Sequence, residues 1–181
     1  MRLPWGVGEY ASETLEFFLR AGIKNPYIIA HSFGARVAIK AAGEFDAPFR
    51  KVILTGAAGL ILNRGFSYRV KVKTYRAVKR LFPAYAERHF GSEEYKNLSP
   101  VMRESYKKIV NEDLRETAKK VKMPILLIYG EKDDVTPVKA GEIYASLMPD
   151  ARLEIISSAG HFAFLDDAVS FRQIAEEFLE E

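Results

Sequence analysis

The stretch YIIAHSFGARVA, residues 27–38, decides how the rest of the chain is interpreted. A short apolar run ends at Ala30, and a second run with helical spacing includes Val37. This pattern predicts a strand, a tight turn and a helix, with Ser32 at the apex of the turn. Small residues at Ala30 and Gly34 allow the strand and the helix to approach each other closely. The unpaired N–H groups at the helix start suit an oxyanion beside the serine, although a serine that only caps an ordinary turn gives the same short pattern.

Further strands and helices are predicted on both sides of this stretch. Helical spacing indicates helices over residues 9–21 and from about Asp167 onward. The apolar runs at 51–56, 124–130 and 152–156 are typical of strands that are buried on both faces of a parallel sheet. Strands that alternate with helices predict an α/β fold, with a mostly parallel sheet of about four strands, helices on both faces and right-handed crossovers.

Residues 63–122 have a different pattern, which is helical, charged and rich in tyrosine. We interpret them as a helical cap inserted into a core made of residues 1–62 and 123–181. The predicted helices of the cap cover residues 66–81, 83–90, 102–110 and 112–119, with a loop at Gly91 and Ser92.

The charge of the chain is unevenly distributed. Residues 64–122 contain 16 lysines and arginines against 7 acidic residues, although the net charge of the whole chain is only +3. Such a basic segment can bind nucleic acid, anionic lipid or an anionic substrate. Here the charges are interleaved with glutamate, valine, tyrosine and leucine, which favours the solvated faces of helices. We therefore predict no nucleic-acid partner.

The composition excludes several other classes of protein. The 181 residues include no cysteine, so disulfides, thiol nucleophiles and thiolate metal sites are ruled out. There is no signal-peptide pattern at the N-terminus and no apolar run long enough to span a membrane, and we expect a cytoplasmic protein. No phosphate-binding loop or metal-binding motif is present, so no cofactor and no metal are predicted, and His31 and His89 are interpreted as structural.

Three loops that follow predicted strands carry the side chains of acyl-transfer chemistry. They contribute Ser32, either Asp133 or Asp134, and His161. Reactive residues of parallel sheets gather at the carboxyl ends of the strands. Acyl transfer needs a hydroxyl nucleophile, an imidazole that moves its proton and a carboxylate that orients the imidazole. The alternatives are an aspartate that caps the helix near Pro137 and a histidine that only packs against aromatic neighbours.

With its serine, acid and histidine in this order, the chain resembles the α/β-hydrolases. The matching segments are Ala30–Gly34, Gly130–Pro137 and Ala159–Leu165, and the likeness extends over essentially the whole chain. It implies a serine hydrolase that cleaves an ester or related acyl bond of a small-molecule substrate.

The resemblance also implies a role for each candidate residue. Ser32 would be the nucleophile, His161 the general base and acid, and the backbone N–H of Phe33 one oxyanion donor. In this family the acid usually stands three residues after the glycine at the strand end, which selects Asp133 over Asp134.

The chain resembles only the C-terminal two-thirds of such a hydrolase, without the family's first strands and without the loop that supplies a second oxyanion donor. In the family the strand before the nucleophile is central, so residues 27–30 would here form an apolar sheet edge with unpaired backbone groups. We expect self-association or a partner chain at this edge. The alternative function is a truncated and weakly active or inactive remnant that serves as a binding or assembly module.

Overall fold

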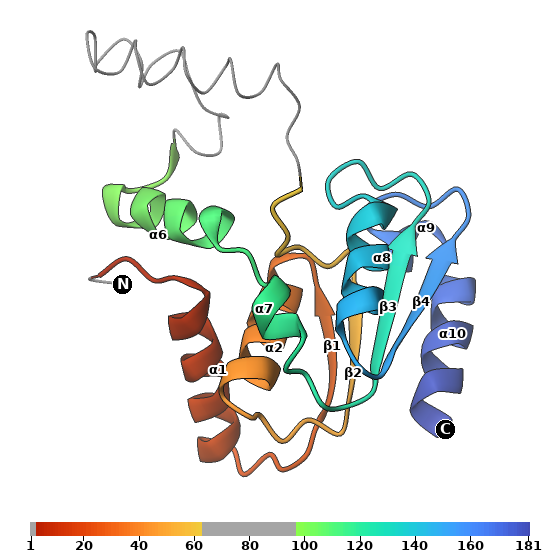
Figure 1. Cartoon of the computed structure of the whole chain (residues 1–181), viewed down its shortest axis with the longest axis horizontal. Coiled ribbons are helices and arrows are strands. Elements are labelled where there is room, and N and C mark those ends of the chain that lie inside the picture. The colour runs from red at the N-terminus through yellow and green to blue at the C-terminus, as the bar shows by residue number, and fades with distance from the viewer. Residues whose placement is uncertain (1–2, 63–96) are drawn as a thin grey trace, which may run out of the picture. The chain divides into compact units, whose positions relative to one another are not determined.

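Four parallel strands form the sheet in the computed structural model, which describes residues 3–62 and 97–181 (Figure 1). The strands lie in the order β1 (Tyr27–His31), β2 (Lys51–Thr55), β3 (Ile125–Gly130) and β4 (Ala151–Ile156). All three neighbouring pairs are parallel. The predicted fold class, an α/β-hydrolase-like parallel sheet of about four strands, is confirmed.

The two central strands are buried along their length because helices cover both faces of the sheet. Every residue of β3 is buried, as are the last four residues of β2. This burial accounts for their continuous apolar sequences, which lack the alternation of a strand with one solvated face.

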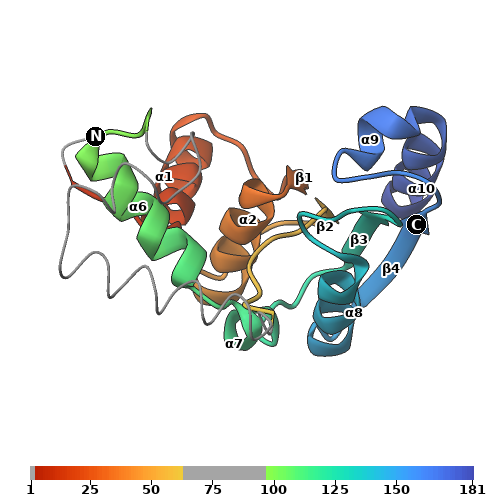
Figure 2. The ribbon, with the colours of Figure 1, turned by 90° about the horizontal axis from the view of Figure 1, so that it is seen from above.

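Each strand is the next neighbour of the one before it, so right-handed crossovers place the connecting helices on one face. That face carries α2 (Phe33–Glu44), α7 (Arg115–Ala118) and α8 (Val138–Leu147), and α1 (Val7–Arg20) packs against α2. The opposite face carries α9 (Ala163–Asp166) and α10 (Ala168–Glu180), as Figure 2 shows. The core under α10 consists of Ile53, Leu126, Ile128, Ile156, Ala159, Ala163, Ala175 and Phe178.

The chain divides into two compact units, and the sheet belongs to the unit made of Val7–Leu60 and Glu112–Glu181. The other unit comprises Met1–Gly6 and Ile61–Asn111. In that unit the described helix is α6 (Pro100–Asn111), whose Ser105 Oγ accepts a hydrogen bond from the Trp5 N–H at 2.9 Å. The helices predicted over 66–81 and 83–90, and the loop at residues 91–92, lie outside the described residues, so the cap stays a prediction.

Strand β1 forms one edge of the described sheet, because β2 is its only paired neighbour there. The side chains of Tyr27 and Ile29 are 43% and 58% exposed. Along this edge, α1, β1 and α2 line a groove of about 470 Å³. Within the described residues, apolar side chains therefore accompany a strand edge with no partner strand, as the sequence predicts for residues 27–30.

Candidate active site

Ser32 occupies the sharp turn between β1 and α2. Its backbone has φ 49° and ψ −106°, and residues other than glycine rarely adopt such a left-handed φ. Two hydrogen bonds hold this conformation, from Ser32 N–H to the Thr55 carbonyl at 3.0 Å and from Ala58 N–H to the Ser32 carbonyl at 3.3 Å. Strained backbone of this kind persists only where its surroundings fix it, and such residues cluster at functional sites.

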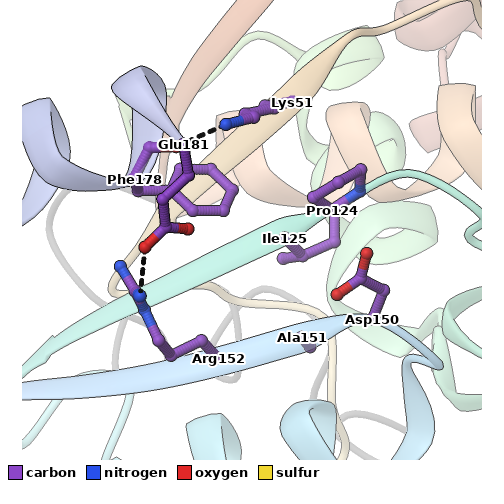
Figure 3. Close-up of a pocket in the computed structure, with 8 residues that line it drawn as sticks. All are labelled: Lys51, Pro124, Ile125, Asp150, Ala151, Arg152, Phe178 and Glu181. Atoms are coloured by element: carbon purple, nitrogen blue, oxygen red, sulfur yellow. Dashed lines mark hydrogen bonds and ion pairs between the residues drawn. The ribbon is translucent and has the colours of Figure 1, made fainter.

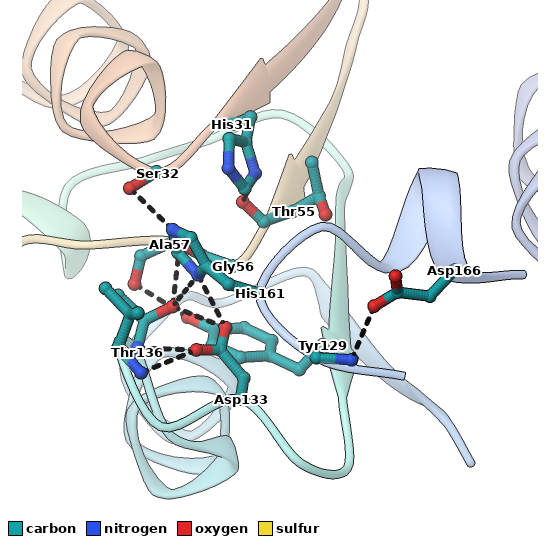
Figure 4. A network of polar contacts seen from close by, with 12 residues as sticks. His31, Ser32, Thr55, Gly56, Ala57, Tyr129, Asp133, Thr136, His161 and Asp166 are labelled. Carbon is teal, nitrogen blue, oxygen red and sulfur yellow. Dashed lines mark hydrogen bonds and ion pairs between the residues drawn. The ribbon is translucent and has the colours of Figure 1, made fainter. Parts of the chain in front are cut away.

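The side chains of Ser32 and His161 meet at the carboxyl end of the sheet, although 129 positions separate them in the sequence. His161 lies on the loop that follows β4, and its Nε2 is 3.0 Å from Ser32 Oγ. Its Nδ1 is 2.8 Å from Oδ2 of Asp133, which lies on the loop after β3 (Figure 4). The three candidate residues therefore form one hydrogen-bonded line.

The carboxylate of Asp133 is buried and fully hydrogen-bonded. One oxygen, Oδ1, accepts the backbone N–H groups of Val135 and Thr136 at 2.9 and 2.7 Å. Burial raises the pKa of this carboxyl, but the hydrogen bonds from His161 and Thr136 outweigh it and hold the pKa below its ordinary value. Asp133 is thus an ionised acceptor for the imidazole, whereas the neighbouring Asp134 is exposed.

Neither aspartate caps the helix that follows. Helix α8 has Pro137 at its N-cap position, and among the described residues no side-chain hydrogen bond caps it. The Asp133 carboxylate instead accepts the N–H groups of Val135 and Thr136, which precede the helix.

Phe33 is the first residue of α2, so its N–H has no carbonyl partner within the helix. This N–H stands beside the Ser32 side chain at the positive end of the helix dipole. The ring of Phe33 contacts Tyr10 of α1 edge-on, with centroids 5.1 Å apart. This packing holds the first turn of α2 against α1.

Two neighbours of the imidazole have no role in the sequence prediction. Gly56 follows β2 with φ +50°, and a Cβ there would lie 3.1 Å from the His161 ring. The Thr136 hydroxyl oxygen lies 2.7 Å from Asp133 Oδ2 and 3.1 Å from His161 Nδ1. In the sequence, the run of small residues 56–59 could have indicated the position of Gly56, because small residues allow close approach at a strand end.

His31 also lies beside the site. Its ring centroid is 4.6 Å from that of His161, and its Nδ1 is 3.1 Å from the Thr55 carbonyl oxygen. Burial and the nearby His161 lower the pKa of His31, against the raising effects of Thr55 and Asp133. His31 is therefore a neutral packing partner at neutral pH, in line with its structural interpretation. His89 lies outside the described residues.

A second hollow, of about 350 Å³, lies at the opposite end of the sheet, where β2, β3 and β4 begin (Figure 3). Two of its basic side chains already have partners. Lys51 Nζ donates to the Phe178 carbonyl at 2.7 Å, and Arg152 binds Glu181 at 2.9 Å. Neither group is available for chemistry in this arrangement.

Over residues 3–62 and 97–181, no cluster of three histidine or acidic side chains could hold a metal ion. Over the same ranges, no helix combines the length and apolar character that crossing a membrane requires.

Sequence comparison assigns the chain to a known family. Residues 3–173 match the alpha/beta hydrolase family, and the chain belongs to that family. An uncharacterized protein of Mycobacterium tuberculosis is 40% identical over 58 residues, which are 32% of this chain and 17% of that protein. The pimeloyl-(acyl-carrier protein) methyl ester esterase of Neisseria meningitidis serogroup B is 34% identical over 68 residues, 38% of this chain and 26% of the esterase. These alignments therefore span about a quarter or less of the relatives' own lengths.

Solved structures share the fold. An esterase from Exiguobacterium antarcticum superposes with a TM-score of 0.69 at 20% identity, covering 94% of this chain and 72% of the esterase. An alpha/beta hydrolase from the sediment metagenome of a Moroccan lagoon gives 0.69 at 23% identity, covering 97% of this chain and 70% of that enzyme. Identities this low establish the shared fold alone.

Proposed function

We propose that the chain is a serine hydrolase that cleaves an ester or related acyl bond, with Ser32, His161 and Asp133 as its catalytic residues. The observation that carries the proposal is the pair of contacts made by the imidazole, at 3.0 Å to Ser32 and 2.8 Å to Asp133. Both ring nitrogens are therefore engaged, each by the group that the chemistry requires. The site needs no cofactor.

The contacts support the following proton path for the reaction. The Asp133 carboxylate accepts a hydrogen bond from Nδ1–H of the neutral imidazole. The Nε2 lone pair of the ring therefore faces the Ser32 hydroxyl. As Ser32 Oγ bonds to the substrate carbonyl carbon, its proton moves to His161 Nε2. The same proton then passes to the leaving alcohol, and an acyl-enzyme ester remains. Water repeats the two steps, releasing the acid and restoring Ser32.

The tetrahedral intermediates carry a negative oxygen that must be stabilised. The N–H of Phe33 is the donor that we assign, supported by its position at the start of α2. Removal of one such donor typically costs on the order of 10²–10³ in rate.

Exposed aromatic rings beside the site support an apolar acyl group, and the names of two matched proteins support an ester bond. The Phe162 ring lies 5.3 Å from the His161 ring and is half exposed, and the partly exposed Phe33 follows the nucleophile. The matched proteins from Neisseria and Exiguobacterium are both named as esterases.

We further propose that residues 63–122 cover the bound small molecule and that the protein acts in the cytoplasm.

Hydrolysis of a short-chain p-nitrophenyl ester tests the proposal. Wild type is expected to turn over the ester, whereas Ser32→Ala should lose nearly all activity. Ser146→Ala is the matched control, because Ser146 is exposed on α8 and bonds only the Ile143 carbonyl in the described structure. Equal turnover by wild type and Ser32→Ala would reject Ser32 as the nucleophile.

A second candidate function is favoured by the exposed edge of β1. We propose that another copy of the chain or a partner chain pairs with this strand, beside the exposed Tyr27 and Ile29. If the ester assay shows no turnover in either protein while association persists, a binding or assembly module becomes the better description. A stable, well-folded monomer in dilute solution would count against association.

A further inference from the structure

Thr136 is buried beside the reacting groups, in the loop between β3 and α8, and is 8% exposed. Its hydroxyl oxygen lies 2.7 Å from Asp133 Oδ2, 3.0 Å from the Gly56 carbonyl oxygen and 3.1 Å from His161 Nδ1. One hydroxyl therefore touches residues that follow β2, β3 and β4 (Figure 4).

The hydroxyl has one proton, which it can donate either to the Asp133 carboxylate or to the Gly56 carbonyl, and lone pairs that can accept the Nδ1–H of His161. The carboxylate and the carbonyl can only accept, and the carboxylate is both closer and charged. Charge-assisted hydrogen bonds are shorter and stronger than neutral ones. The Thr136 hydroxyl therefore donates its hydrogen bond to Asp133 Oδ2. A lone pair of the hydroxyl then faces the Nδ1–H of His161, which is shared between Asp133 and Thr136.

Thr136 also holds the other oxygen of the same carboxylate. Its backbone N–H donates to Asp133 Oδ1 at 2.7 Å while its hydroxyl donates to Oδ2. Two donors from one residue, one for each oxygen, fix the carboxylate in plane and in rotation. Rotation of this group would turn Oδ2 away from the imidazole.

We propose that Thr136 is a positioning residue, whose hydroxyl orients the Asp133 carboxylate and thereby the ring of His161. The inference rests on the proposed hydrolase function for its kinetic consequence. Its structural content, the dependence of the Asp133–His161 contact on one hydroxyl, can be measured without activity.

The test compares Thr136→Val, which keeps the shape and removes the hydroxyl, with Thr136→Ser, which keeps the hydroxyl. Thr117→Val is the matched control. Thr117 is 5% exposed and its hydroxyl donates to Glu44 at 2.7 Å, so this variant also loses a partly buried hydrogen bond to a carboxylate. Circular dichroism and thermal unfolding establish that each variant is folded. Thr117→Val is expected to lose stability and keep its kcat.

For the p-nitrophenyl ester, kcat of Thr136→Val should fall about 10- to 100-fold with KM nearly unchanged, the range expected for one bond to a charged group. Thr136→Ser should recover most of the loss. In NMR spectra of the free protein, the His161 Nδ1–H signal should shift or broaden in Thr136→Val alone.

An unchanged kcat together with an unchanged Nδ1–H signal in Thr136→Val would overturn the inference. If wild type itself hydrolyses no ester, the proposed function fails, and the NMR comparison alone decides whether Thr136 orders the pair. A lower kcat that Thr136→Ser does not restore would assign the effect to packing and also overturn it.

Discussion

Gly56 lies directly against the imidazole of His161: a Cβ at Gly56 would be 3.1 Å from both Cε1 and Nδ1 of the ring. The same Cβ would lie 3.3 Å from Asp133 Oδ2. The end of β2 therefore lies directly against the candidate base and acid, and a Cβ at Gly56 would fit only if the His161 ring moved by a few tenths of an ångström.

We predict that Gly56→Ala displaces the imidazole and lowers kcat by about 100-fold, the effect that a small misplacement of a catalytic group can have. The positive φ of Gly56 should also cost about 1 kcal/mol of stability. Ester kinetics and urea unfolding measure the two effects. Gly22→Ala is the matched control, because Gly22 has φ +66° and, apart from its chain neighbours, no described residue would have an atom within 4 Å of its Cβ. Loss of activity in both variants would assign the effect to backbone strain.

The two adjacent aspartates should differ sharply. Asp133→Asn removes the ionised acceptor of His161 Nδ1 and favours the wrong tautomer, which should lower kcat by on the order of 10⁴. Asp134 is exposed, and Asp134→Asn should leave kcat within about twofold. Steady-state kinetics of the two variants are the measurement. Similar losses in both would mean that the contact to His161 is not what matters.

The sequence predicted the elements that local patterns define. The turn at Ser32, the apolar strands and their parallel pairing follow from hydrophobic runs and from small residues at fixed offsets. The residue types alone leave Asp133 and Asp134 open, because both stand on one loop, and only the family's usual spacing after the strand-end glycine favours Asp133. Burial distinguishes them, and burial is a property of the folded chain.

Thr136 and Gly56 illustrate what local patterns cannot predict. Their contacts with His161 join residues 25 and 105 positions apart, and they exist only because three loops converge at one edge of the sheet. A threonine before a proline and a glycine after a strand are common loop residues. Their importance here comes from tertiary approach.

The free energy of unfolding of the protein should depend on pH through Asp133. Hydrogen bonds hold its pKa below the ordinary value, so folding stabilises the ionised form. This contribution is fully present above about pH 5 and is lost as the pH falls below about 4 toward the folded-state pKa. Asp133→Asn should therefore be less stable than wild type at pH 7, with a difference that shrinks at pH 3. Urea unfolding at both pH values measures it, and a constant difference would contradict the assignment.

Association at the sheet edge should respond to charge. A lysine in place of Ile29, which is 58% exposed on β1, should disfavour strand pairing and shift the protein toward monomer. Leu19→Lys is the matched control, because Leu19 is an equally apolar, 75% exposed residue on α1. Light scattering after size-exclusion chromatography gives the masses. If Ile29→Lys and wild type have the same mass at every concentration, association does not use this edge.

Covalent labelling tests the central claim, that Ser32 is a nucleophile activated by His161, most directly. The intact protein is treated with a fluorophosphonate, and the modified residue is located by peptide mass spectrometry. One adduct per chain on the Ser32 peptide, absent from Ser32→Ala and strongly slowed in His161→Gln, is the predicted result. No adduct, or one that forms equally well in His161→Gln, would contradict the claim.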